Sequence, residues 1–241
     1  MVSVNKVGQI VRDDGFVGLL RRSSRFFYKS VLRPLLPGTN FYRKNGVKWK
    51  DKKSLDPYFG INYDDPTYEA ALVSAVRSNV RPGDYVGVIG GGRGISTVVA
   101  AESAGEEGGV IVYEGAEERT DWIRNTVTLN AVESIVEVEH AIVGPRVKVY
   151  GVADSAKQVN SSDLPAFDVL EMDCEGAELD ILKNLTIRPG VIVVEVHPEN
   201  CREEDVTWVL SNMGYEIVDR GLENPDTDQP LPILTARLTE E

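Results

Sequence analysis

The sequence predicts an α/β protein built on a doubly wound, mostly parallel sheet, and three features of the chain support this. From residue 85 onward, short apolar runs alternate with segments of helical period, which is the pattern of a parallel sheet with helices on both faces. One run, at 167–172, is mostly apolar, as in a strand buried on both faces. The last two runs have no helix between them, so we expect an antiparallel hairpin at one edge of the sheet.

The individual elements follow from local signals. The turn Arg81–Asp84, with its Pro-Gly pair, opens the first strand of the alternating series. We expect helices at 66–79, 95–104, 116–131, 177–185 and 203–213, and strands at 85–89, 110–114, 135–142, 167–172, 191–196, 215–219 and 231–238. A polar loop at 221–229 joins the last two strands.

The chain of 241 residues is long enough for one α/β domain and an additional segment. We divide it into a basic helical extension with a polar connector, 1–63, and an α/β domain, 64–241. No apolar stretch reaches the roughly 20 residues that a membrane crossing needs, and the N-terminus lacks the apolar region of a secretory signal. The two cysteines, Cys174 and Cys201, exclude a disulfide framework and fit a reducing cytoplasm. No CxxC or HExxH zinc motif is present.

Charge is distributed very unevenly along the chain. Residues 1–53 contain 13 Lys and Arg against 3 acidic residues, a net charge of +10, and the remainder contains 13 against 35, a net charge of −22. Beyond residue 53 the only lysines are Lys148, Lys157 and Lys183. A very acidic, lysine-poor surface stays hydrated in concentrated salt, so we hypothesise a halophilic source. The acidic body also argues against nucleic acid as a partner.

The N-terminal segment predicts a basic amphipathic helix at 14–33. Its apolar face carries Phe16, Leu20, Phe27 and Val31, and its opposite face carries Arg21, Arg25, Lys29 and Arg33. Such a helix could lie on an anionic membrane surface, which would suit a lipid-linked glycan as substrate. Alternatively, its apolar face could pack on the domain or on a second subunit of a homo-oligomer. The following segment, 38–63, is expected to be a connector.

A glycine-rich loop follows the strand predicted at 85–89. Gly90, Gly91, Gly92 and Gly94 provide a tight turn that a ligand can approach closely, and a helix begins directly after it. The spacing is GxGxG, whereas the GxGxxG pattern of dinucleotide folds fails at Ile95. Glu114 ends the next strand, where a carboxylate can accept hydrogen bonds from both hydroxyls of a ribose. The loop and this acid together predict a site for S-adenosylmethionine.

Two acidic segments carry a more specific resemblance. The run DVLEMDCEGAE at 168–178, followed by LDIL, and the run VEVHP at 194–198 resemble the signature of the FkbM family of methyltransferases. The resemblance covers roughly residues 68–197. Members of this family use S-adenosylmethionine to methylate oxygen, frequently on sugars or other hydroxylated metabolites. The resemblance implies the class I methyltransferase sheet, in which the strands predicted at 85–89 and 167–172 are neighbours and end at one crevice.

The residues expected to surround the methyl acceptor come from these two segments. We expect Asp173, Glu175 and His197 to be catalytic, and Glu178 and Glu195 to bind substrate. A hydroxyl acceptor must lose a proton, and His197 is the best-tuned base near neutral pH. Asp173 and Glu175 are its rivals, because clustered carboxylates raise one another's pKa. An acceptor that is itself a carboxylate would need no base, and the acids would hinder its binding.

Other readings of the same residues stay open. Glu178 could complement its helix dipole, and His197 could be a plain loop residue. Asp173 and Glu175 could hold a divalent cation, but no third ligand is evident, so we expect no metal. The chain also departs from its relatives at Val88, two residues before the first loop glycine, where a carboxylate often orients the methionine amino group. A substitute such as Asp173 would then be needed.

The sequence therefore predicts an S-adenosylmethionine-dependent O-methyltransferase acting on a sugar hydroxyl or carboxylate, with a role in glycan assembly. It would be cytoplasmic, with a peripheral position at the inner membrane face as a further expectation. Because of Val88, a non-catalytic cofactor-binding module of the same fold is one alternative. An NAD-dependent enzyme is another, against which the glycine spacing and the C-terminal hairpin argue.

Overall fold

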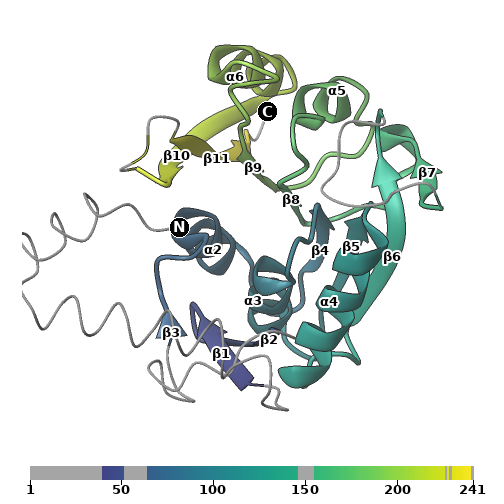
Figure 1. Cartoon of the computed structure of the whole chain (residues 1–241). Coiled ribbons are helices and arrows are strands. Elements are labelled where there is room, and N and C mark those ends of the chain that lie inside the picture. The colour runs from purple at the N-terminus through teal and green to yellow at the C-terminus, as the bar shows by residue number, and fades with distance from the viewer. Residues whose placement is uncertain (1–39, 52–63, 146–154, 226, 228–229, 240–241) are drawn as a thin grey trace, which may run out of the picture. The chain divides into compact units, whose positions relative to one another are not determined.

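The structure is a computed structural model that describes residues 40–51, 64–145, 155–225, 227 and 230–239 (Figure 1). The chain divides into two compact units. One unit comprises Arg43–Trp49 and Asp64–Glu241 and contains the sheet and every candidate site residue. The other comprises Met1–Tyr42 and Lys50–Tyr63. The helix predicted at 14–33 lies outside the described residues.

The larger unit is built on an eight-stranded sheet. Its strands are β4 (Tyr85–Ile89), β5 (Gly109–Glu114), β6 (Val136–Val143), β7 (Lys157–Val159), β8 (Val169–Met172), β9 (Val191–Glu195), β10 (Tyr215–Glu223) and β11 (Leu231–Leu238). They lie in the order β10-β11-β9-β8-β4-β5-β6-β7. All pairs are parallel except β11 with β9 and β10 with β11. The predicted C-terminal hairpin and the predicted contact of the first and fourth strands of the alternating series, β4 and β8, are thereby confirmed.

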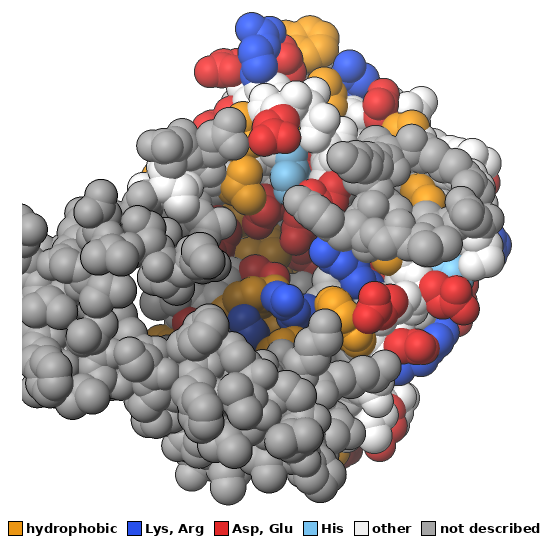
Figure 2. All heavy atoms as spheres, in the orientation of Figure 1, with side chains coloured by type: hydrophobic (Ala, Val, Ile, Leu, Met, Phe, Trp, Pro, Cys, Tyr) orange, Lys and Arg blue, Asp and Glu red, His pale blue; other side chains and the backbone are white. Residues whose placement is uncertain are grey.

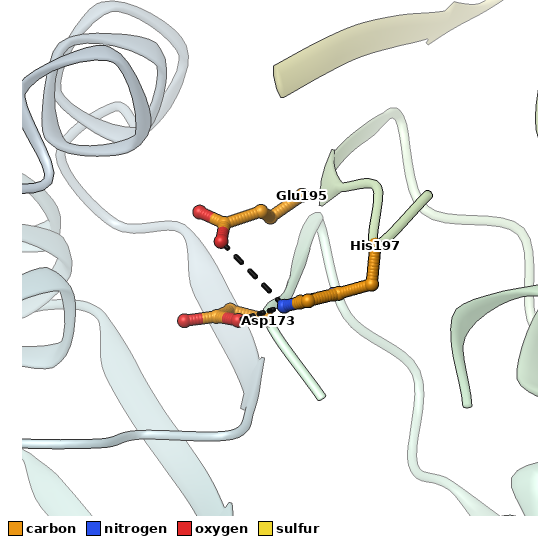
Figure 3. A group of neighbouring side chains, drawn as sticks. All are labelled: Asp173, Glu195 and His197. Atoms are coloured by element: carbon orange, nitrogen blue, oxygen red, sulfur yellow. Dashed lines mark ion pairs between the residues drawn. The ribbon is translucent and has the colours of Figure 1, made fainter. Parts of the chain in front are cut away.

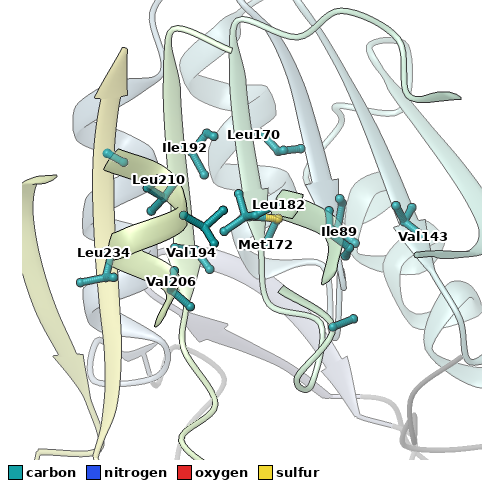
Figure 4. Close-up of a cluster of buried hydrophobic side chains, with 14 of the residues drawn as sticks. Ile89, Val143, Leu170, Met172, Leu182, Ile192, Val194, Val206, Leu210 and Leu234 are labelled. Atoms are coloured by element: carbon teal, nitrogen blue, oxygen red, sulfur yellow. The ribbon is translucent and has the colours of Figure 1, made fainter. Parts of the chain in front are cut away.

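Helices cover both faces of this sheet (Figure 1). On one face lie α2 (Ala70–Asn79), α3 (Ile95–Ala104) and α4 (Glu117–Leu129), and on the other lie α5 (Glu178–Lys183) and α6 (Glu203–Asn212). The core on the α5–α6 side is drawn in Figure 4, with Ile89, Leu170, Met172, Leu182, Ile192, Val194, Val206 and Leu210 among its buried side chains. Among the described residues, no helix has the length and apolar character that crossing a membrane requires.

Several element boundaries differ from the predictions for local reasons. The helix expected from residue 66 begins at Ala70, because Glu69 has a left-handed backbone with φ of 48°. Strand β10 runs on to Glu223, so the loop predicted from residue 221 is shorter. The short strand β7 and a 3₁₀ turn at Ser161–Asp163 occur where no element is predicted.

The connector expected at 38–63 also contains strands. β1 (Asn40–Lys44) and β2 (Val47–Asp51) form a small sheet with the two-residue strand β3 (Asp64–Asp65). The alternation of polar and apolar residues in these strands is too short to stand out from a loop. Within this segment, Val47 is 1% exposed and packs in the core cluster of α2, α3 and α4.

Candidate functional site

The loop between β4 and α3 lies against the end of β8. Gly90 has a φ of 91°, and a Cβ atom at this position would fall 1.7 Å from the carbonyl oxygen of Asp173. The backbone N–H of Asp173 in turn donates to the carbonyl oxygen of Ile89 at 2.9 Å. Only glycine permits both this backbone conformation and this approach. The glycine at position 90 therefore brings the loop and Asp173 together at one edge of the sheet.

The other loop glycines have two different tasks. A Cβ on Gly91 would fall 2.4 Å from Cγ2 of Val112, and one on Gly94 would fall 3.2 Å from Cα of Ile123, so these two allow close packing on β5 and α4. Gly92 has a φ of 54°, and apart from its two chain neighbours no atom of the described residues lies within 4 Å of its Cβ position. Gly92 is therefore the glycine of the loop whose backbone borders open space, where a ligand can approach.

Glu114, at the end of β5, is tied to this loop. Its carboxylate accepts hydrogen bonds from the backbone N–H of Gly92 at 3.0 Å and of Ala116 at 2.8 Å. Burial raises the pKa of Glu114, although these two bonds act in the opposite direction. Each carboxylate oxygen keeps acceptor capacity for a ligand hydroxyl. The open backbone of Gly92 with Glu114 beside it fits the adenosyl part of S-adenosylmethionine, as the sequence predicts.

A cluster of acidic side chains surrounds His197 (Figure 3). The Nε2 atom of His197 lies 3.6 Å from Oδ1 of Asp173, 3.7 Å from Oε2 of Glu175 and 3.7 Å from Oε1 of Glu195. Asp173 follows β8 and Glu195 ends β9, its parallel neighbour. The carboxyl ends of neighbouring parallel strands meet at one edge, which explains how residues distant in sequence converge here.

Glu178 contacts the other side of the imidazole. Its side chain is 0% exposed, and its Oε1 lies 2.8 Å from Nδ1 of His197. The backbone N–H of Gly176 donates to the same oxygen at 3.1 Å. Burial alone would raise the pKa of Glu178, but the hydrogen bond and charge of His197 lower it overall. Burial alone would lower the pKa of His197, but the hydrogen bond and charge of Glu178 raise it overall.

The acidic cluster borders a cavity of about 340 Å³, which is within the size range of small-molecule sites. It is lined by Asp173, Glu175, Glu195, His197, Pro198, Glu199, Asn200 and Leu231. Acidic side chains and a histidine gather at a hollow in the face of the molecule that Figure 2 shows. Of the predicted acceptor residues, only Glu178 is missing from the lining, because it is buried behind the ring of His197. A larger cavity of about 810 Å³ is lined by other residues, among them Gln158, Ser161 and Lys183.

The carboxyl groups in this cluster are difficult to ionise together. Burial raises the pKa of Glu195 to about 8, and it raises the pKa of Asp173 well above its ordinary value, with the charge of Glu195 as the next cause. Burial also raises the pKa of Glu175. Groups this close share their protons and titrate as a unit. The cluster can therefore accept or release a proton near neutral pH.

Three of these residues also form a donor set for a cation. One ligand atom each of Asp173, Glu195 and His197 lies within 4.8 Å of the other two (Figure 3). The sequence suggested Asp173 and Glu175 as ligands and no third one. The structure brings Glu195 and His197 to this position, and carboxylate oxygens with an imidazole nitrogen suit several divalent ions.

A group of cationic and aromatic side chains lies next to the glycine loop and was not predicted from the sequence. The guanidinium of Arg93 lies 5.1, 5.6 and 5.8 Å from the ring centres of Trp49, Tyr68 and Trp122, and it donates to the Tyr68 hydroxyl at 3.1 Å. The ammonium of Lys44 lies 3.2 Å from the Tyr68 ring centre. These residues come from four separate segments, so no local motif could have revealed them. Trp122, on α4, also belongs to this group.

Comparison with known proteins gives a family match for this chain. Residues 99–217 match the family model described as the methyltransferase FkbM domain. This match includes Glu114, the acidic cluster and His197, and it begins just after the glycine loop. A comparison with curated protein sequences gives no significant match.

Solved structures share the fold at low sequence identity. A protein from Pyrococcus horikoshii assigned as a transferase is 14% identical, with a TM-score of 0.55 over 84% of this chain and 72% of that one. The precorrin-6y C5,15-methyltransferase of Geobacter metallireducens GS-15 is 16% identical, with a TM-score of 0.52 over 72% of this chain and 89% of that one. These likenesses establish the Rossmann-like sheet of class I methyltransferases.

The family match covers Glu114, the acidic cluster and His197, and the glycine loop with Glu114 fits the donor. The chain carries a methyltransferase FkbM domain and is a methyltransferase of class I fold that uses S-adenosylmethionine as its cofactor.

Proposed function

We propose that the enzyme transfers the methyl group to a hydroxyl oxygen of a sugar or a similar polyhydroxylated acceptor, with His197 as the general base. The observation that carries this proposal is the hydrogen bond between Glu178 and the Nδ1 atom of His197, at 2.8 Å. An ionised carboxylate can only accept here, so Nδ1 holds the proton. The lone pair of Nε2 then faces the cavity.

His197 has the arrangement of a base that is oriented by a buried acid. Glu178 fixes the tautomer and stabilises the imidazolium that forms when Nε2 takes a proton. The bound cofactor supplies an electrophilic methyl group. The chain's own contribution is to hold the acceptor oxygen in line, exclude water and receive the hydroxyl proton at Nε2 of His197.

The charge of the cavity favours a hydroxyl acceptor over a carboxylate. Asp173, Glu175 and Glu195 line the cavity around Nε2 of His197. Any of these groups that ionises would repel an anionic acceptor such as a uronic acid, and a bound anion would raise their pKa values further. They can accept hydrogen bonds from the several hydroxyls of a neutral sugar. On this basis the neutral sugar is the preferred form of the acceptor, and a part in glycan assembly belongs to the same proposal.

An assay with a labelled methyl donor tests the acceptor class. Neutral glycans and matched glycans that contain uronic acids are compared as acceptors for the full chain. Label is expected on the neutral sugars, in alkali-stable ether linkage. Label that appears only on uronic acids, as alkali-labile esters, would overturn the proposal.

The role of His197 is tested by His197→Asn in the same assay. A general base contributes roughly 100-fold to 10,000-fold, so the rate constant should fall by at least about 100-fold with little change in affinity for S-adenosylhomocysteine. An unchanged rate would exclude His197 as the base.

The donor set Asp173, Glu195 and His197 supports a second reading, in which a divalent cation activates the acceptor hydroxyl. Chelation distinguishes the two readings. If dialysis against a chelator leaves the rate unchanged, the histidine acts alone. If the rate is lost and Mg²⁺ or another divalent ion restores it, the cation takes the place of the base.

A further inference from the structure

The first strand of the alternating series lacks a carboxylate that methyltransferases of this class often have. Two positions before Gly90 stands Val88, which is 0% exposed. An aliphatic side chain cannot accept a hydrogen bond from the amino group of the cofactor's methionine part. A carboxylate from another element is needed if that amino group is to be held by an acid.

Glu171 lies at the level of Val88, one strand away. The two residues are register partners between β8 and β4, and register partners of parallel strands project from the same face of the sheet. The alternation along β8 agrees, since Val169 belongs to the same core cluster as Val88, and Leu170 belongs to the cluster on the other face. The Ser96 hydroxyl, on the second residue of α3, donates to Oε2 of Glu171 at 3.4 Å. The carboxylate therefore lies beside the helix that the glycine loop opens.

The Glu171 carboxyl group lacks part of the hydrogen bonding that a buried acid requires. Its side chain is 0% exposed, and Oε1 has no hydrogen-bond partner within the described part of the chain. Its bond to Ser96 is long for an O–H donor. The acids Asp173 and Glu69 lie close enough to interact electrostatically with Glu171. A buried acceptor left in this state is costly, which points to a donor that arrives with a ligand.

We propose that Glu171 holds the positively charged amino group of S-adenosylmethionine, in the role that a carboxylate at position 88 would otherwise have. An ammonium group supplies what this position lacks, namely N–H donors for Oε1 and a positive charge among Glu171, Asp173 and Glu69. Glu171 is accordingly a cofactor-binding residue. This assignment does not depend on the nature of the methyl acceptor.

Binding of two ligands to the full chain tests the assignment. The first is S-adenosylhomocysteine, and the second is its deamino analogue, which keeps the carboxylate and lacks only the amino group. Both are titrated calorimetrically into the wild type, Glu171→Gln and a control, Glu223→Gln. Glu223 is also buried, but it accepts hydrogen bonds from the backbone N–H groups of Ala71 and Leu72 at the start of α2.

We expect the wild type and Glu223→Gln to prefer S-adenosylhomocysteine over the deamino analogue by about tenfold or more, the range for one hydrogen bond to a charged group. Glu171→Gln should lose most of this preference and bind the deamino analogue as the wild type does. An undiminished preference in Glu171→Gln, or an equal loss of affinity for both ligands, would overturn the assignment.

A second variant covers the case in which Glu171→Gln does not fold. Glu171→Leu replaces the acid by an apolar side chain of similar size, which needs no hydrogen-bond partner beside the buried Val88. Loss of the preference for the amino ligand in this variant supports the assignment, and an undiminished preference contradicts it. None of these measurements uses an acceptor, so they stay separate from the test of the methyl-transfer chemistry.

Discussion

Oε1 of Glu178 lies 2.8 Å from Nδ1 of His197, and the carboxylate is buried while the ring borders the cavity. The pKa of the acid is lowered and that of the histidine is raised, as expected of a partly buried ion pair. Glu178 was predicted to touch the methyl acceptor. In the structure its contact is with His197, so it orients this imidazole and raises its pKa.

The first prediction concerns the pH profile of methyl transfer. His197 must be neutral to accept a proton, so the rate of the wild type should rise with pH through the raised pKa of His197. Glu178→Gln removes the charge that raises this pKa, so the rising limb should move to lower pH. The maximal rate should fall by about tenfold or more because the ring is less well oriented. Glu204→Gln, at an exposed residue of α6 outside the cavity lining, is the control and should shift neither quantity.

The second prediction concerns stability and Glu195. Its pKa is raised from 4.5 to about 8 in the folded chain, chiefly by burial. Between these two values the folded state binds more protons than the unfolded state, so the free energy of unfolding should fall as the pH rises. Glu195→Gln should flatten this slope and be more stable than the wild type above about pH 8. Denaturant unfolding at several pH values measures this, and parallel curves for both chains would contradict it.

The third prediction separates two glycines of the cofactor loop. Gly90→Ala would drive a Cβ into the carbonyl oxygen of Asp173, so it should fail to fold or lose several kcal/mol of stability. In Gly92→Ala the added methyl group would lie in open space. The free energy of unfolding should therefore fall by only about 1–2 kcal/mol, because alanine is strained in a left-handed backbone. Its affinity for S-adenosylhomocysteine should nevertheless fall, because the added methyl group occupies the ligand's approach. Thermal unfolding and calorimetry on both variants provide the comparison.

The fourth prediction concerns salt. Residues 54–241 carry a net charge of −22, from 13 basic and 35 acidic residues. If this reflects adaptation to high salt, the free energy of unfolding should increase markedly from low to multimolar KCl, because counterions screen the repulsion among the acids. Unfolding curves at both salt concentrations test this. Equal stability in the two would argue against a halophilic origin.

The fifth prediction concerns membrane contact through 14–33, a segment outside the described residues. If its basic face binds anionic lipid, the full chain should float with anionic vesicles at low salt. A variant with Arg21, Arg25, Lys29 and Arg33 replaced by glutamine should then remain unbound. Neutral vesicles are the control. Equal flotation of both chains, or none of either, would remove the membrane interpretation.

Much of the α/β architecture was accessible from the sequence, because it depends on local periodicity. The helix at 95–104 and the strand at 85–89 have the predicted bounds, since a glycine turn and a change of period mark their ends. The elements that were missed, such as β1 and β7, are short strands of five and three residues. Their pairing depends on distant neighbours, so their local pattern carries little information.

The candidate site likewise has parts that could be predicted from the sequence and parts that only the structure reveals. The sequence by itself indicated the glycine loop, Glu114 and the two acidic segments as parts of a site, because each has residue types with a recognisable chemistry at an informative position. Only the tertiary structure decided that Glu178 supports His197 and that Glu171 lies beside Val88. Both relationships depend on strand order and register, which bring together side chains that the linear sequence keeps 19 and 83 positions apart.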